Sequence, residues 1–329
     1  MKRIDYYWNS VNYISILLWP LSLVFFCLSE IRKQLYTLNL LSSYRAPVPV
    51  IVVGNITVGG TGKTPFIIEL VKQLQQQGKN PAVISRGYGG RSQHWPLVVN
   101  DQTNAAQVGD EPQLIFQRTK CPVVVGPNRK EDIELILEKF KCDVILSDDG
   151  LQHYALQRDV EICIVDAIKR FGNGWFIPAG PMRESPDRLN TVDLVLYNDG
   201  EDKLPSFKMT PTMCLPVAHD NLASVELNDF AGKTVHAIAG IGHPQRFFSM
   251  LKQHNINVIP HAYADHHRYQ LSDLIFDDEF SVLMTEKDAV KCSDLVLGDH
   301  WSVPIVISLS DSAQQKVNQI IDLVLHNKL

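Results

Sequence analysis

VIVVGNITVGGTGKTP, at residues 50–65, is the most informative stretch of this chain. Its first four residues are all β-branched, which is typical of a buried strand in a parallel sheet. The glycine-rich segment that follows ends in Gly62-Lys63-Thr64, and a helix-like pattern continues over 65–77. A strand that passes through such a segment into a helix is the setting of a P-loop, which binds nucleotide phosphates. A glycine-rich turn with only a packing role is the alternative.

Each residue type in this loop suits phosphate binding. Glycines let backbone N–H groups surround the phosphates, and the helix N-terminus adds the positive end of its dipole. Lys63 would neutralise the β- and γ-phosphate oxygens, and the Thr64 hydroxyl would ligate Mg²⁺. The motif G-x-x-x-x-G-K-[ST] would have glycine at position 57, where this chain has threonine. We predict ATP and Mg²⁺ as cofactors, and the predicted nucleotide-binding residues are Thr57, Val58, Gly59, Gly60, Thr61, Gly62, Lys63 and Thr64.

Other short apolar runs indicate further strands, separated by helix-like stretches at 65–77 and 129–140. Strands that alternate with helices form crossover units, so the strands should be parallel. These strands are expected at 82–84, 123–125, 144–146, 162–165 and 194–196. Beyond the prolines at 205, 211 and 216, a second set follows, with strands at 235–239, 258–259, 282–284 and 304–307 and helices at 245–254 and from about 313.

The fold class predicted from this order is α/β. We expect a P-loop NTPase-type parallel sheet core, a second and smaller α/β lobe, and an N-terminal membrane-associated helix. The expected boundaries are 1–41 for the helical segment, 42–205 for the P-loop core and 206–329 for the second lobe, which an extended linker joins to the core.

The apolar run at 13–28 carries no charged residue, and charged residues flank it on both sides. It is shorter than the roughly 20 apolar residues of a spanning helix, and Pro20 in its middle favours a kink. We therefore favour a helix lodged in one leaflet of a membrane. A spanning helix and a buried core helix are the alternatives. A cleaved signal peptide is disfavoured, because the sequence after Leu28 has no small-residue cleavage site.

Acidic residues stand at two places where a nucleotide enzyme needs them. Asp148 and Asp149 directly follow the strand at 144–147, as a magnesium-holding Walker B carboxylate would. Asp110 and Glu111 lie in the turn GDEP at 109–112, which by itself indicates a helix N-terminus. The predicted metal-binding residues are Thr64, Asp148, Asp149 and Glu111.

Three further motifs leave their roles open. RGYGG at 86–90 is either a phosphate- or acceptor-binding loop or a mobile surface loop. HAYADHH at 261–267 suggests a metal site by composition, but its spacing is poor for zinc. MTEKD at 284–288 resembles the guanine-reading N-K-x-D motif, yet one residue is missing between the lysine and the aspartate, so a helix cap is the alternative.

The bulk composition excludes other classes. A formal net charge of −5 gives no basic field of the kind that nucleic acid binding requires, so we expect no nucleic acid partner. The six cysteines lie far apart and contain no C-x-x-C pair, which argues against a zinc knot or a disulfide framework and favours a reducing compartment.

Seven motifs, taken in their order, resemble the tetraacyldisaccharide 4′-kinase family of lipid A biosynthesis. They extend over 54–292, and the apolar run fits the family's membrane-associated helix. The threonine at position 57 also belongs to the family's form of the loop. The motifs are GNITVGGTGKTP, RGYGG, GDEP, SDDGLQH, FGNGWFIPAGPMRE, DHH and TEKDAVKC.

The resemblance implies transfer of the ATP γ-phosphate to the 4′-hydroxyl of tetraacyldisaccharide 1-phosphate, an anionic lipid disaccharide, which gives lipid IVA. It places the protein at the cytoplasmic face of the bacterial inner membrane, peripheral or monotopic through its N-terminal helix. By the same resemblance Asp110 is the catalytic base, His266 supports it, and Lys63 serves the phosphate. Arginine suits phosphate binding, and the candidate substrate-binding residues are Arg86, Arg183 and Arg188.

Two rival functions share the P-loop. A membrane-tethered nucleotide switch or chaperone would hydrolyse nucleotide without lipid, whereas the kinase would need its acceptor for fast turnover. A ligase or a kinase of a soluble metabolite would leave the apolar run at 13–28 without a purpose.

Overall fold

The computed structural model describes residues 4–201, 204–217, 223–293, 295 and 298–326. The chain forms two compact units, and each is discontinuous in sequence. The first comprises Met1–Ser85, Asn128–Lys208 and Ser308–Leu329, and the second comprises Arg86–Pro127 and Met209–Ile307. This division differs from the boundaries expected from sequence, because 86–127 belongs with the second unit and the C-terminal segment with the first.

The first unit is built on a sheet in the order β14-β8-β7-β6-β1-β5-β2. β1 pairs in parallel with β5 on one side and β6 on the other, with Val53 opposite Asp148 and Gly54 opposite Cys163. The carboxyl ends of these strands therefore lie at one edge of the sheet. The strands that lie wholly within the first unit are β1 (Val50–Gly54), β2 (Pro81–Ser85), β5 (Val144–Asp148), β6 (Val160–Asp166) and β7 (Leu194–Asn198), and the unit contains part of β8 (Ser206–Pro211) and of β14 (Ile305–Leu309).

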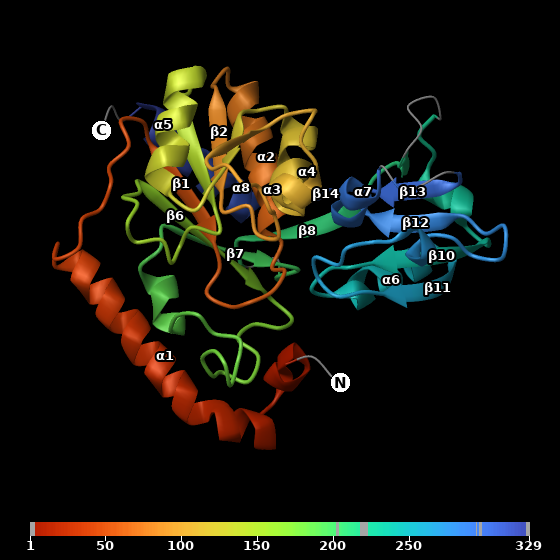
Figure 1. Cartoon of the computed structure of the whole chain (residues 1–329), viewed down its shortest axis with the longest axis horizontal. Coiled ribbons are helices and arrows are strands. Elements are labelled where there is room, and N and C mark those ends of the chain that lie inside the picture. Colours follow the sequence, from red (N-terminus) through yellow and green to blue (C-terminus); the bar gives the residue numbers. More distant parts are fainter. Residues whose placement is uncertain (1–3, 202–203, 218–222, 294, 296–297, 327–329) are drawn as a thin grey trace. The chain divides into compact units, whose positions relative to one another are not determined.

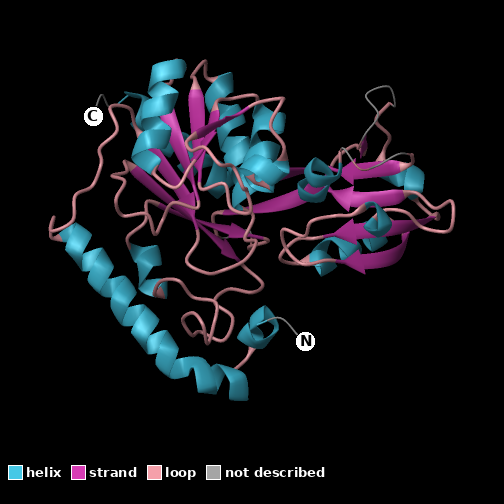
Figure 2. Cartoon of the chain, in the orientation of Figure 1, coloured by secondary structure: helices cyan, strands magenta, loops and turns pink. Residues whose placement is uncertain are grey.

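Helices complete the first unit, as Figures 1 and 2 show. The helix predicted at 65–77 is α2 (Lys63–Gln76), which packs against β1, β2 and β5. All five residues of β1 are buried, which accounts for its continuous apolar sequence. The α8 residue Gln314 exchanges hydrogen bonds with Gln73 of α2, and this contact joins the C-terminal segment to the first unit. The remaining helices are α1 (Tyr13–Thr37), α5 (Arg129–Lys139), α8 (Asp311–His326), η1 (Ile4–Asn9) and η2 (Pro186–Asn190).

The N-terminal apolar run forms α1, which is longer than expected and continues through Pro20. Its N-terminus has a capping box: the Asn12 side chain accepts hydrogen bonds from the Ile14 and Ser15 N–H groups, and the Ser15 hydroxyl accepts one from the Asn12 N–H. Most of its large apolar side chains are exposed, among them Leu17 at 78% and Leu28 at 62%. Only 11% of its most apolar 18-residue stretch is buried. By length and composition the helix could cross a membrane. This exposure argues against the alternative of a buried core helix.

α1 contacts the rest of the first unit through a few polar and aromatic groups. The Ser22 hydroxyl donates to the Phe176 carbonyl at 2.7 Å and accepts from the Ala179 N–H at 3.0 Å. The Phe26 and Phe176 rings lie 4.6 Å apart, and in the preceding helix η1 the Trp8 indole donates to the Pro178 carbonyl. Segment 172–179, which we call the seat of α1, is therefore the surface of the first unit against which α1 packs.

The second unit has its own sheet, in the order β11-β10-β12-β13-β9. The strand expected at 304–307 in the second lobe is β14 of the first sheet, and the second sheet contains β13, which sequence patterns missed. Arg118 of α4 forms an ion pair of 2.6 Å with Glu286 of α7, which joins 86–127 to this unit. The elements are β9 (Leu215–Pro216), β10 (Thr234–Ala239), β11 (Asn257–Ala262), β12 (Val282–Thr285), β13 (His300–Val303), α6 (Pro244–Gln253), α7 (Glu286–Cys292), η3 (Leu227–Phe230) and η4 (Leu271–Asp273), together with β3 (Leu97–Val99), β4 (Val123–Val125), α3 (Ala105–Val108) and α4 (Asp110–Thr119).

Candidate active site

The loop predicted to bind phosphate joins β1 to α2. Gly62 has φ +97° and forms the N-cap of α2, and no side chain among the described residues caps this helix. Its first turn holds no acidic residue. A Cβ built at Gly59 or Gly60 would meet no described atom within 4 Å, so the backbone there faces open space. A polyphosphate fits this turn, because the free N–H groups at a helix N-terminus bind anions.

The first part of the loop is held by the protein itself. Thr57 forms an isolated antiparallel bridge with Met182, and the Val58 N–H donates to the Pro181 carbonyl at 2.8 Å. The Arg183 N–H donates to the Ile56 carbonyl at 2.7 Å. The Val58 N–H is bonded to Pro181 and so does not face a phosphate. The predicted backbone contacts to phosphate are therefore expected from the glycines that follow Val58.

Lys63 and Arg183 converge on Asp149, which follows β5 in a left-handed conformation with φ 49°. Lys63 Nζ lies 3.5 Å from Asp149 Oδ1, and Arg183 contacts both carboxylate oxygens at 2.9 and 3.0 Å. Burial alone would raise the pKa of Asp149, but the two cations outweigh it and lower that pKa to about 2. Asp149 therefore balances the charge of two phosphate-binding candidates, a contact that was not expected from the sequence.

Asp148 and Thr64 are the oxygen donors best suited to Mg²⁺. Asp148 ends β5 beside β1 and accepts a hydrogen bond of 3.0 Å from the Ser85 hydroxyl. Thr64 lies in the first turn of α2 and is buried. No group of three or more His, Cys, Asp or Glu side chains in the described part of the chain could hold a metal. Mg²⁺ commonly takes one or two protein oxygens and completes its shell with water and phosphate, so this donor set fits it.

The three candidate arginines have different surroundings. Arg188 is buried and forms ion pairs with Glu161 and, at 3.3 Å, with Glu184. It belongs to an internal ion-pair network and is not exposed for binding the acceptor. Arg86 is exposed. Arg183 contacts Asp149, and its N–H bonds to the start of the loop that is predicted to bind phosphate.

A carboxylate–histidine pair lies in the second unit. Asp110 begins α4 and is only 4% exposed. His266 Nδ1 lies 3.0 and 2.9 Å from its two oxygens, although the residues are 156 positions apart. The Tyr88 ring packs beside the imidazole, with centroids 4.9 Å apart. This pair can accept and hold a proton.

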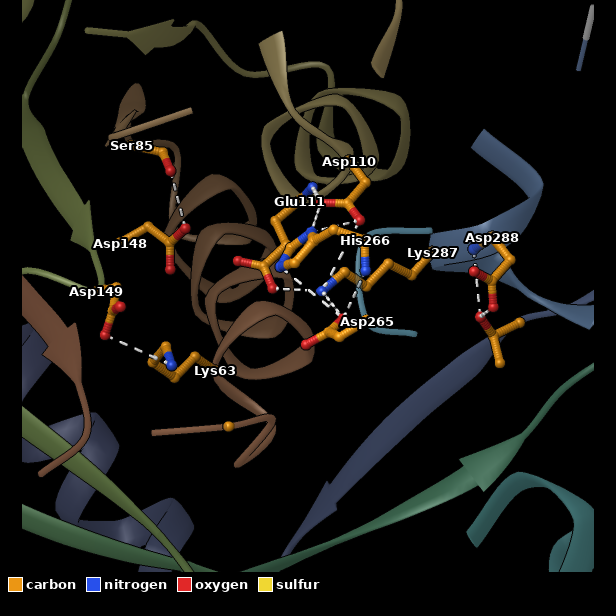
Figure 3. Close-up of polar contacts among 12 residues, drawn as sticks. Lys63, Ser85, Asp110, Glu111, Asp148, Asp149, Asp265, His266, Lys287 and Asp288 are labelled. Carbon is orange, nitrogen blue, oxygen red and sulfur yellow. Dashed lines mark hydrogen bonds and ion pairs between the residues drawn. The ribbon is translucent and has the colours of Figure 1, made fainter. Parts of the chain in front are cut away.

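Two lysines place positive charge beside this pair, and Figure 3 shows one of them, Lys287. Lys287 lies 2.9 Å from Glu111, 3.2 Å from Asp265 and 3.9 Å from Asp110. Lys291 also lies 3.9 Å from Asp110. Burial acts to raise the pKa of Asp110, but the hydrogen bond with His266 and the lysine charges hold it below its ordinary value. Glu111, expected as a metal ligand, is here the partner of Lys287.

Comparison with protein families matches residues 14–325 to the family described as "LpxK: Tetraacyldisaccharide-1-P 4'-kinase". The chain belongs to this family. It is 47% identical over 309 residues to a tetraacyldisaccharide 4'-kinase of Actinobacillus pleuropneumoniae serotype 5b, covering 92% of this chain and 94% of the relative. It is 49% identical over 305 residues to that of Pasteurella multocida, covering 91% and 92%.

A solved family member has the same fold. The crystal structure described as the "apo" form of LpxK from Aquifex aeolicus in complex with ATP superposes with a TM-score of 0.76 at 27% sequence identity. The match covers 94% of this chain and 99% of that one. The α/β class with a parallel sheet core, expected from sequence, is thereby confirmed.

The remaining motifs of this family member have structural partners. The histidines of HAYADHH turn to separate groups: His261 to His236, His266 to Asp110 and His267 to Asp273. They do not converge on a common point. In TEKDAVKC, Thr285 caps α7 by accepting from the Asp288 N–H, so the helix-cap interpretation is confirmed.

Sequence reasoning missed two groups next to the predicted site residues of this kinase-family chain. Lys287 entered the sequence analysis only as part of MTEKD, which does not match the guanine-reading motif. It follows the end of a strand, β12, and strand ends are common positions for functional side chains. Gln152 donates to the Asn55 carbonyl at 3.0 Å and to Glu184 at 2.7 Å, so it holds the start of the loop that follows β1. Its position in SDDGLQH was the available signal.

Proposed function

We propose that the protein is a kinase that transfers the γ-phosphate of ATP to the 4′-hydroxyl of tetraacyldisaccharide 1-phosphate and so forms lipid IVA. In this step the oxygen of the 4′-hydroxyl bonds to the γ-phosphorus, the bond from that phosphorus to the β,γ-bridging oxygen breaks, and ADP leaves. The observation that carries the proposal is the open glycine loop with Lys63 at the start of α2, in a chain whose family is named for this reaction.

The first unit holds the phosphate donor. The backbone from Gly59 to Gly62 and the ammonium of Lys63 bind the phosphates, and Asp149 positions Lys63 and Arg183. Thr64 and Asp148 would hold Mg²⁺, which neutralises charge on the phosphate oxygens when bound. Phosphoryl transfer asks mainly for this positioning and charge neutralisation.

Asp110 and His266 supply the base. An ionised carboxylate accepts the proton of the sugar hydroxyl, and the imidazole in contact with it shares or passes on that proton. A carboxylate whose pKa is held low is a weak base on its own, so the proton that Asp110 accepts must move on, and His266 is the group in contact that can take it.

The acceptor explains the exposed apolar surface of α1. Four acyl chains hold the acceptor in the bilayer at about 0.8 kcal/mol per buried CH₂, so the enzyme works at the membrane surface. We place α1 in one leaflet at the cytoplasmic face of the bacterial inner membrane. Arg86 and Arg183 are the candidates for the acceptor's phosphate.

The test is transfer of labelled γ-phosphate from ATP to tetraacyldisaccharide 1-phosphate in detergent micelles. Lys63→Ala and Asp110→Asn should each abolish labelled lipid, whereas Lys130→Ala, on the exposed face of α5, should not. Nucleotide hydrolysis without labelled lipid in the unaltered protein would overturn the proposal and favour the membrane-tethered switch.

A further inference from the structure

Asn198 is a fully buried amide at the carboxyl end of β7, where it lies opposite Asp166 of β6 in the parallel register. Its Nδ2 donates to the Thr61 carbonyl at 3.1 Å, across 137 positions of sequence. Because a carbonyl can only accept, the NH₂ side of the amide must face Thr61. No hydrogen-bond partner of Asn198 Oδ1 lies among the described residues, so the contact with Thr61 is the bond that orients this side chain.

The bond to Thr61 also orients the next peptide group. In a planar trans peptide the C=O and the following N–H point in opposite directions. With the Thr61 carbonyl directed inward to Asn198, the Gly62 N–H points away from the sheet. That N–H belongs to the N-cap residue of α2, where a phosphate would bind.

Gly62 and Asn198 fit one another closely. A Cβ at Gly62 would lie 2.9 Å from Asn198 Nδ2 and 3.1 Å from the Phe207 ring. The glycine therefore meets two demands at once, because its φ of +97° is also one that side chains rarely adopt. Asn55, another fully buried amide, braces the same loop from within through longer contacts to the Gly59 carbonyl at 3.4 Å and the Thr61 hydroxyl at 3.3 Å.

We infer that Asn198 is a positioning residue for nucleotide binding, which turns the Gly62 N–H toward the phosphates of ATP by holding the Thr61 carbonyl inward. The inference rests on the proposed function and adds a residue outside the motifs that identify the nucleotide loop. It acts through Thr61 and touches neither substrate.

The experiment compares the affinity for ATP with the KM for the lipid acceptor. Asn198→Ala leaves the Thr61 carbonyl without its donor and should raise the Kd and KM for ATP about tenfold or more, with the lipid KM unchanged. Asn198→Asp keeps the volume but sets an acceptor against an acceptor and adds a negative charge near the phosphates, so its loss should be larger. Asn100→Asp is the matched control, since Asn100 lies in an exposed turn and uses its oxygen to accept from the Gln102 N–H.

Binding of ATP to the unaltered protein separates the two levels of the argument. If the unaltered protein binds no ATP, the proposed function fails. If it binds ATP and Asn198→Ala binds within twofold of it, or if the lipid KM rises in the same ratio, the inference on Asn198 fails. Asn198→Ser replaces Asn198→Ala should the alanine variant not fold, and the same limits apply to it.

Discussion

Replacing Ser22 with alanine should loosen α1 from its seat on segment 172–179. The Ser22 side chain is 3% exposed, and its hydroxyl serves both the Phe176 carbonyl and the Ala179 N–H. Alanine would leave these two backbone groups without that partner. A buried group left unsatisfied costs about 1–3 kcal/mol, so we expect about 2–6 kcal/mol for the two together.

This cost should appear as local opening, because the rest of α1 is largely exposed. Since about 1.4 kcal/mol changes an equilibrium tenfold, the Ala179 amide should exchange with deuterium roughly 30-fold faster or more. Hydrogen–deuterium exchange of a peptide covering 174–184 measures this directly. The segment continues into Pro181 and Arg183, which bond to the nucleotide loop, so the exchange at Val58 should rise as well.

Thr37→Ala is the matched control, since its exposed hydroxyl bonds only within α1, to the Lys33 carbonyl. Its exchange at Ala179 should equal that of the unaltered protein. If Ser22→Ala exchanged at the same rate as Thr37→Ala, the two hydrogen bonds would not hold α1, and the reasoning would be wrong.

Three further predictions concern the site and the membrane surface. Asp148→Asn should raise the Mg²⁺ concentration for half-maximal activity, whereas Asp149→Asn should lower kcat and leave that concentration unchanged; a magnesium titration in which both variants shift equally would contradict the separate roles. His266→Ala should lower kcat while the KM for ATP stays the same, because the imidazole contacts Asp110 and acts in the transfer step; steady-state kinetics showing a raised KM for ATP at normal kcat would argue against this. At pH 7 a maleimide should label Cys27, which is exposed on α1, and spare Cys163, whose pKa burial raises to about 12. Phospholipid vesicles should slow the labelling of Cys27, and an equal rate with and without vesicles would contradict insertion of that face of α1.

Local sequence was enough to predict the central strands of the first sheet and the glycine-rich loop after β1. The β-branched run at 50–53, the glycines that follow and the helix after Lys63 each express a preference of a few neighbouring residues. Because those preferences act over short distances, β1 and α2 lie within two residues of where the pattern placed them. The exposed apolar helix near the N-terminus was predicted in the same way.

Contacts between distant residues could not be read from such patterns. Asp110 meets His266 across 156 positions, a pairing that only the family resemblance implied, and Asn198 meets Thr61 across 137; no local periodicity encodes either pairing. The same applies to the charges, since Asp149 and Glu111 each had the chemistry of a metal ligand, and only their neighbours Lys63 and Lys287 revealed them as ion-pair partners. Folding brings these groups together by burying the strands and helices that carry them, and the burial strengthens the electrostatic interactions that then set their roles.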